Sequence, residues 1–143
     1  MADSELHALY NSLSPVYTSS FLTISINGQD KYLFNEWSGV LDAKRARQGC
    51  LAVLDQLQEH PHAKVLNNNI KVTGHYPGAI DWVGTVWFPT MYALGVQWFA
   101  WVYSPAFYTQ ISTDEIIGLS SKVTIQTFYE VQAAHDWLVQ VKE

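Results

Sequence analysis

The chain has 143 residues, a length typical of one domain, and almost half of them are apolar, which is enough for a packed core and argues against disorder. A formal charge of −5 with only eight Lys and Arg excludes a nucleic-acid-binding surface, because phosphate contacts need clustered basic side chains. The single cysteine, Cys50, excludes an intramolecular disulfide and a thiolate metal site, and no apolar run approaches the ~20 residues of a membrane span. The acidic N-terminus has no apolar run that suits a signal peptide, so we expect a cytoplasmic protein without membrane insertion.

The first elements predicted from the sequence are two paired strands. Residues 1–16 are weakly patterned, and we expect them to form an N-terminal extension, weakly helical or frayed, before a single domain over residues 17–143. Residues 17–26 alternate between apolar and polar, and Asn27-Gly28 supplies the positive φ angles of a tight turn. With a second strand at residues 32–37, the sequence predicts an opening β-hairpin.

A helix and a short strand are expected next. Apolar residues recur every three or four positions over residues 42–60, which is typical of a helix packed on one side. Asp42 is positioned to cap this helix and Pro61 to end it. Residues 63–66 read as a short apolar strand, after which Asn67-Asn68-Asn69 begins a polar loop.

The second half of the chain predicts alternating helices and strands. Residues 80–94 form a helix in which Pro89 removes a backbone hydrogen bond, so we expect a kink or a split there. Residues 96–103 are apolar on both faces, which favours a strand inside a sheet covered by helices. Ser104 is expected to cap the following helix, and a strand at residues 123–128 precedes the last helix.

The predicted order of elements is β-β-α-β-α-β-α-β-α. This order defines an α/β fold with a mixed sheet of four to five strands, in which an opening hairpin is followed by parallel strands. Right-handed crossovers connect those parallel strands, and helices flank the sheet.

Several short motifs are spread over residues 17–140. They are Glu36-Trp37-x-Gly39, Val65-Leu66-Asn67-Asn68-Asn69, Lys71-Val72-Thr73-Gly74, Trp87-Phe88-Pro89, the run from Phe99 to Pro105, and Thr127-Phe128 leading to Ala134 and Trp137-Leu138. Together they resemble the STAS-like domains of bacterial proteins, the fold shared with anti-sigma-factor antagonists. The resemblance implies a regulatory or scaffolding role rather than catalysis.

The chain differs from the anti-sigma-factor antagonists in the loop that carries their phosphorylation site. In the anti-sigma-factor antagonists, a partner kinase phosphorylates a serine in the loop after the strand that corresponds to residues 63–66. This chain has Asn67-Asn68-Asn69 there, and the nearest hydroxyl belongs to Thr73. The phosphorylation switch of the family therefore does not transfer to a residue of this sequence.

Loops at the carboxyl ends of parallel strands meet at one edge of a sheet, where ligands tend to bind. We expect a candidate ligand- or partner-binding site at this edge. Its residues are Asn67, Asn68, Asn69, Thr73, His75, Tyr76, Asp81, Trp82 and Ser104. The alternative is that the asparagines are ordinary turn residues and that the histidine is solvated.

Catalytic and metal-binding chemistry is not expected from the sequence. His75, Asp81 and Ser104 have the residue types of a hydrolytic triad, but no Gly-x-Ser-x-Gly elbow is present, and helix capping already explains Ser104. Cys50 lies on the apolar side of its helix, which favours a packed, inert thiol. We expect no cofactor and no bound metal.

Three functions remain open at this level. The first is a non-enzymatic regulatory or scaffolding domain that binds a protein partner or a second copy of itself. It follows from rings at loop edges and helix starts, which often anchor interfaces. Those rings are Tyr76, Trp82, Phe107 and Tyr108. The second is a small-molecule or lipid-binding domain with a pocket between the sheet and the helix that contains Pro89. The third is an unrecognised enzyme that uses His75, Asp81 and Ser104.

Overall fold

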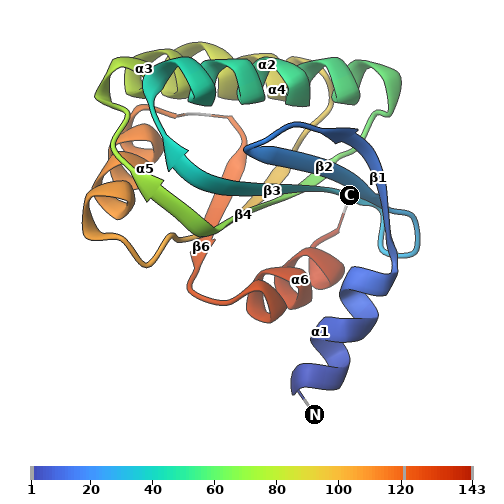
Figure 1. Ribbon diagram of the computed structural model, residues 1–143. Coiled ribbons are helices and arrows are strands. Elements are labelled where there is room, and N and C mark those ends of the chain that lie inside the picture. Colours follow the sequence, from blue (N-terminus) through green and yellow to red (C-terminus); the bar gives the residue numbers. More distant parts are fainter. Residues whose placement is uncertain (1, 121, 143) are drawn as a thin grey trace.

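A computed structural model describes residues 2–120 and 122–142, and these residues form a mixed six-stranded sheet with helices on both faces (Figure 1). The strands lie in the sheet in the order of the sequence. They are β1 (Leu13–Thr18), β2 (Leu22–Asn27), β3 (Tyr32–Leu41), β4 (Lys64–Gly74), β5 (Trp98–Val102) and β6 (Thr124–Phe128). The first three strands pair antiparallel, and β3, β4, β5 and β6 run parallel to one another.

The helices divide between the two faces of the sheet (Figure 1). Right-handed connections between parallel strands that advance in one direction place every connecting helix on the same face. This face, the crossover face, carries α2 (Ala43–Glu59), α3 (Pro77–Trp82), the π-helical η1 (Val83–Trp87), α4 (Phe88–Ala93) and α5 (Phe107–Leu119). The opposite face, the α6 face, carries α6 (Val131–Gln140) and α1 (Ala2–Asn11). None of the helices in the described ranges is long and apolar enough to cross a membrane.

Each face of the sheet has its own hydrophobic core, because side chains alternate between the faces along each strand. On the crossover face, Leu33, Val65 and Phe99 are fully buried against α2 and the π-helical segment. On the α6 face, Phe34 and Leu66 pack against α6. Residues that neighbour each other in a strand therefore belong to different cores, as the apolar character of residues 96–103 on both faces predicts.

The predicted element order is confirmed from the hairpin onward, but the start of the chain differs. The sheet has six strands, because residues 13–18 form the additional strand β1. The expected first strand, residues 17–26, is interrupted at Ser19, whose Oγ accepts hydrogen bonds from the amides of Phe21 and Leu22 and turns the chain. Pro15 lies in β1, which is an edge strand, where the missing amide hydrogen is tolerated.

Pro89 does not split its helix. α3, η1 and α4 follow one another without a break, and the amide of Phe88 donates to the carbonyl of Val83, five residues back. This widened π turn precedes the proline and leaves room for its ring where a regular α-turn would clash. The expected split is therefore wrong, and a π-helical segment precedes the proline.

The three consecutive asparagines do not begin a loop. β4 extends from Lys64 to Gly74, and Asn67, Asn68 and Asn69 lie inside it, each no more than 3% exposed. The low strand propensity of asparagine is overcome here because these amides are hydrogen-bonded, Asn67 and Asn68 to side chains of β3 and Asn67 to Asn69 within β4. Placing these residues in a loop at the carboxyl end of the strand is therefore wrong.

Candidate functional site

The asparagines of β4 face opposite sides of the sheet. Asn68 lies on the α6 face, where its Nδ2 donates to Glu36 Oε2 at 3.3 Å and to the Tyr10 hydroxyl at 3.4 Å. The same Tyr10 hydroxyl donates to Glu36 Oε2 at 2.6 Å. This cluster attaches α1 to the sheet. The hydrogen bonds of Asn68 thus explain why this polar side chain is buried, without a role in binding a ligand.

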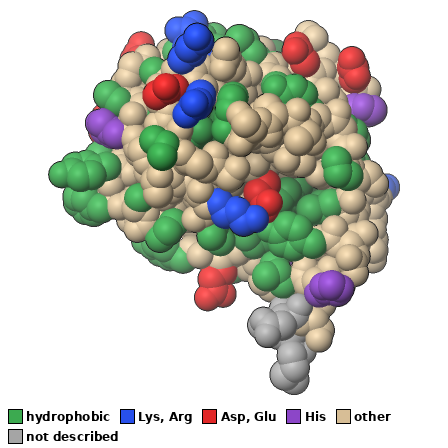
Figure 2. Space-filling view, viewed as in Figure 1, with side chains coloured by type: hydrophobic (Ala, Val, Ile, Leu, Met, Phe, Trp, Pro, Cys, Tyr) green, Lys and Arg blue, Asp and Glu red, His purple; other side chains and the backbone are tan. Residues whose placement is uncertain are grey.

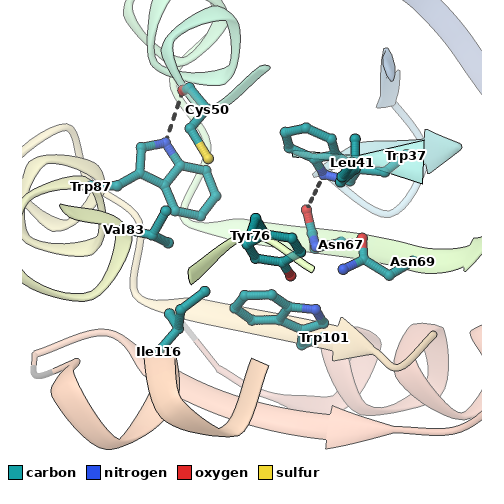
Figure 3. A pocket seen from close by; sticks show the side chains of 10 residues that line it. All are labelled: Trp37, Leu41, Cys50, Asn67, Asn69, Tyr76, Val83, Trp87, Trp101 and Ile116. Carbon is teal, nitrogen blue, oxygen red and sulfur yellow. Dashed lines mark hydrogen bonds between the residues drawn. The ribbon is translucent and has the colours of Figure 1, made fainter. Parts of the chain in front are cut away.

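Asn67 and Asn69 line a cavity of about 30 Å³ between the sheet and the helices of the crossover face (Figure 3). We call it the buried cavity. Its lining is Trp37, Leu41, Cys50, Asn67, Asn69, Tyr76, Val83, Trp87, Trp101 and Ile116. Trp37 Nε1 donates to Asn67 Oδ1 at 2.8 Å, and Asn67 Nδ2 donates to Asn69 Oδ1 at 3.3 Å. Figure 3 shows both amides pointing into the space between the indoles of Trp37 and Trp101.

Three polar side chains form a row across the sheet above this cavity. Asn35 on β3, Asn67 on β4 and Trp101 on β5 are partners in the strand register, and they face the crossover side. Within the described part of the chain, both amide atoms of Asn35 and the indole nitrogen of Trp101 are buried without a hydrogen-bond partner. We call these residues the polar row. Buried orphan groups of this kind are rare and destabilising, so they call for an explanation.

The size of the buried cavity limits what it holds. A bound water needs about 10–15 Å³ by this measure, so the cavity has room for about two waters. A benzene-sized ligand needs a cavity several times larger, and it enters only if the surrounding helices move. The described residues that line the cavity carry no ionised side chain, so the cavity suits a neutral occupant better than a charged one.

The carboxyl ends of β4, β5 and β6 do meet at one edge, and only some of the predicted residues lie there. Thr73, His75 and Ser104 follow or end these strands. Ser104 Oγ donates to the carbonyl of Val72 and accepts from the amide of Ala106 at 3.0 Å, so it joins two strand ends. The prediction that Ser104 caps α5 is wrong, because Ala106 occupies that position.

Exposed aromatic rings dominate this edge. Phe107 is 69% exposed, Tyr108 67% and Tyr129 74%, which is unusual for rings in a small protein. Tyr108 contacts His75 with ring centres 6.1 Å apart, and Tyr129 contacts Tyr103 at 5.1 Å. We call Tyr103, Phe107, Tyr108, Tyr129 and His75 the aromatic edge. Figure 2 shows hydrophobic side chains gathered over α5 and projecting from the surface.

Two of the rings expected at this surface lie elsewhere. Tyr76 is only 4% exposed and lines the buried cavity, and burial raises the pKa of its hydroxyl to about 12. Trp82 is half-buried, and the Arg47 guanidinium lies 4.7 Å from the centre of its ring, a cation–π contact. Asp81, next to it, is exposed on α3. Tyr76 and Trp82 are therefore not free anchors for a partner.

Acidic side chains lie close to the aromatic edge. The sequence contains no Lys or Arg between Lys71 and Lys122, the stretch that contributes most of this edge. Asp114 is exposed on α5, and the Tyr103 hydroxyl donates to it. Glu130 is exposed next to Tyr129. The edge thus combines apolar rings with an acidic rim.

The residues of the sequence-derived triad do not hydrogen-bond to one another among the described residues. His75 Nδ1 lies 3.2 Å from the hydroxyl of Ser112, on α5, rather than contacting Ser104. Groups of three or more His, Cys, Asp or Glu that could hold a metal are absent from the described ranges. Cys50 is 4% exposed, and burial raises the pKa of its thiol, which disfavours the reactive thiolate.

Three residues of these sites are absent from the site predicted from the sequence: Asn35, Trp101 and Tyr129. Asn35 and Trp101 join Asn67 only through the strand register, which the predicted strand ends did not fix. Tyr129 follows β6 directly, and an aromatic residue immediately after a parallel strand is a signal that would have placed it at the edge.

Comparison with known proteins adds no identity: no family model matches the chain, and no curated protein matches it.

Proposed function

We propose that this chain is a STAS-like, non-enzymatic regulatory or scaffolding domain that works by binding a protein partner through the aromatic edge. The observation that supports this most directly is the exposure of Phe107, Tyr108 and Tyr129, each about two-thirds or more, on neighbouring segments. Aromatic residues are enriched among interface anchors, because they bury a large area at little cost in side-chain entropy. The resemblance to STAS-like domains supports the regulatory role.

The partner is a protein with an apolar patch surrounded by basic side chains. The acidic rim, Asp114 and Glu130, attracts such a surface. A second copy of this chain would bring the same acidic rims together, and like charges placed opposite each other disfavour association. We therefore expect a monomer of 16.2 kDa in light scattering, and a homodimer would contradict this choice of partner.

The double variant Phe107→Ser with Tyr108→Ser is expected to lose the partner and keep the fold. Both rings are mostly in solvent, so their removal changes the free energy of unfolding by less than about 1 kcal/mol. Loss of two interface anchors weakens binding by at least about a hundredfold. Quantitative mass spectrometry of proteins that co-purify from cells that naturally produce this protein measures the loss.

Leu51→Ser is the matched control, because Leu51 is an exposed apolar residue, at 49%, on α2. The control is expected to retain the partner at wild-type level. Equal recovery of the partner by the double variant would contradict the proposal.

A second candidate function is supported by the buried cavity. Trp101 Nε1 is a buried donor with no partner among the residues that the structure describes, and it lines the cavity with Asn67, Asn69 and the π-helical residues Val83 and Trp87. π-helical turns recur at functional sites. We propose that the cavity is the closed form of a site for a small neutral molecule with a hydrogen-bond acceptor.

Trp101→Phe is expected to abolish binding at this cavity, because phenylalanine keeps the ring and removes the donor. Native mass spectrometry of protein purified without denaturation should show an added mass on the wild type and none on the variant. Trp98→Phe is the control, since Trp98 lies on the same strand but packs on the α6 face. No added mass on the wild type would count against this second function.

A further inference from the structure

A groove of about 310 Å³ lies at the amino end of β3, whereas the aromatic edge lies at the carboxyl ends of the parallel strands. α1, α6 and the turn between β2 and β3 form its walls. Its lining is Glu5, Ala8, Leu9, Ser12, Gln29, Asp30, Gln132, His135 and Val139. The groove combines acidic and amide groups with the apolar side chains of Ala8, Leu9 and Val139, and its lining contains no Lys or Arg.

A chain of hydrogen-bonding groups holds the base of the groove. The hydroxyl of Tyr32, which is fully buried, lies 2.9 Å from His135 Nδ1. Burial raises the pKa of this hydroxyl. The other ring nitrogen of His135, Nε2, lies 3.9 Å from Asp30 Oδ2. Asn27 Nδ2 approaches the same oxygen at 3.4 Å, so the Asp30 carboxylate is held in place.

One hydrogen-bond acceptor that lines the groove, an amide oxygen, receives no hydrogen bond from the described residues. Gln132 Oε1 is buried and has no hydrogen-bond partner among the described residues. The orientation of this amide is fixed, because its Nε2 donates to Asp136 Oδ1 at 3.0 Å and a flipped amide would place its oxygen against that carboxylate. A buried carbonyl oxygen without a donor calls for an explanation, and a donor from a bound water or ligand would supply one.

We propose that this groove binds a small organic cation, a primary ammonium on a short apolar stem. An ammonium group has three donors and no acceptor. The carboxylates of Glu5 and Asp30 and the free oxygen of Gln132 supply acceptors and compensating negative charge. Leu9 and Val139 supply the apolar surface on which the stem packs.

The experiment is a titration of the full chain with 1,4-diaminobutane. Calorimetry measures the binding, and NMR measures the changes in amide chemical shifts. We expect saturable binding with shifts confined to α1, α6 and the β2–β3 turn. 1,4-Butanediol, which has the same stem without charge, is expected not to bind. Absence of saturation with the diamine, or equal binding of the diol, would overturn the proposal.

Asp30→Asn and Asp55→Asn form the matched pair of variants. Asp30→Asn removes a charge from the groove and is expected to weaken binding at least about tenfold, and Gln132→Met, which removes the free oxygen, is expected to weaken it as well. Asp55 is an exposed carboxylate on α2, and its variant should bind like the wild type. Equal weakening by Asp30→Asn and Asp55→Asn would show general charge attraction and overturn the site.

The double variant Phe107→Ser with Tyr108→Ser should still bind the diamine. Failure of the protein-binding proposal can therefore be distinguished from failure of the diamine site.

Discussion

Replacing Asn67 with leucine is expected to lower the free energy of unfolding by about 2–5 kcal/mol. Leucine matches asparagine in shape, so packing is nearly conserved and the hydrogen bonds are what is lost. The variant leaves Trp37 Nε1 without its acceptor and Asn69 Oδ1 without its donor, both inside the buried core. Each buried group that loses its partner costs about 1–3 kcal/mol. Urea denaturation followed by tryptophan fluorescence measures the change.

A loss smaller than about 1 kcal/mol for Asn67→Leu would contradict the central place of this amide in the cavity wall. It would mean that water already satisfies Trp37 and Asn69 without Asn67. Asn67→Asp provides a second reading, because the carboxylate keeps an acceptor for Trp37 and places a charge in a cavity lined by neutral groups. We expect its destabilisation to diminish as the pH falls and the carboxyl becomes protonated.

Asn35→Leu is expected to have the opposite effect and raise the free energy of unfolding by about 1–3 kcal/mol. Asn35 is the register neighbour of Asn67 on the next strand and is fully buried, yet neither polar atom of its amide has a hydrogen-bond partner in the described part of the chain. The substitution removes an unsatisfied polar group and replaces it with an apolar side chain of the same shape. The same urea titration measures this gain, and Asn67→Leu serves as its paired comparison.

Destabilisation by Asn35→Leu would contradict this prediction. It would show that the Asn35 amide is hydrogen-bonded in the folded protein, as by a buried water, or that leucine does not fit its site. A gain in stability, in contrast, identifies Asn35 as a residue that this fold retains at the expense of stability, as binding sites often do.

The sequence predicted the architecture well because it depends on patterns that are local. The apolar character of residues 96–103 on both faces, the amphipathic helix behind Asp42 and the order of elements all follow from spacing along the chain, and they correspond to β5, α2 and the parallel sheet. Pro89 was interpreted from its effect on a regular α-helix alone. The π turn of η1 that precedes it has no signal in the apolar pattern of residues 80–94.

The candidate site was predicted less well, because its residues meet through the strand register. Asn67, Asn68 and Asn69 have the composition of a turn, and their place inside β4 depends on Trp37, Glu36 and Tyr10, which are distant in the sequence. Phe107 and Tyr108 were predicted correctly at an exposed edge, since they follow a strand end and Pro105. Tyr76 follows a strand in the same way but is buried, because α5 covers it.

Site-specific photocrosslinking tests the protein-binding proposal most directly. Benzoylphenylalanine is introduced in separate variants at Tyr108 and Tyr129 on the aromatic edge, and at Leu51 on α2 and Val139 on α6 as exposed controls. Irradiation in cells that naturally produce this protein should yield the same partner at Tyr108 and Tyr129 and not at Leu51 or Val139, and high salt should reduce the yield in lysate. The same products at all four positions, or a crosslink only to a second copy of this chain, would contradict the proposal.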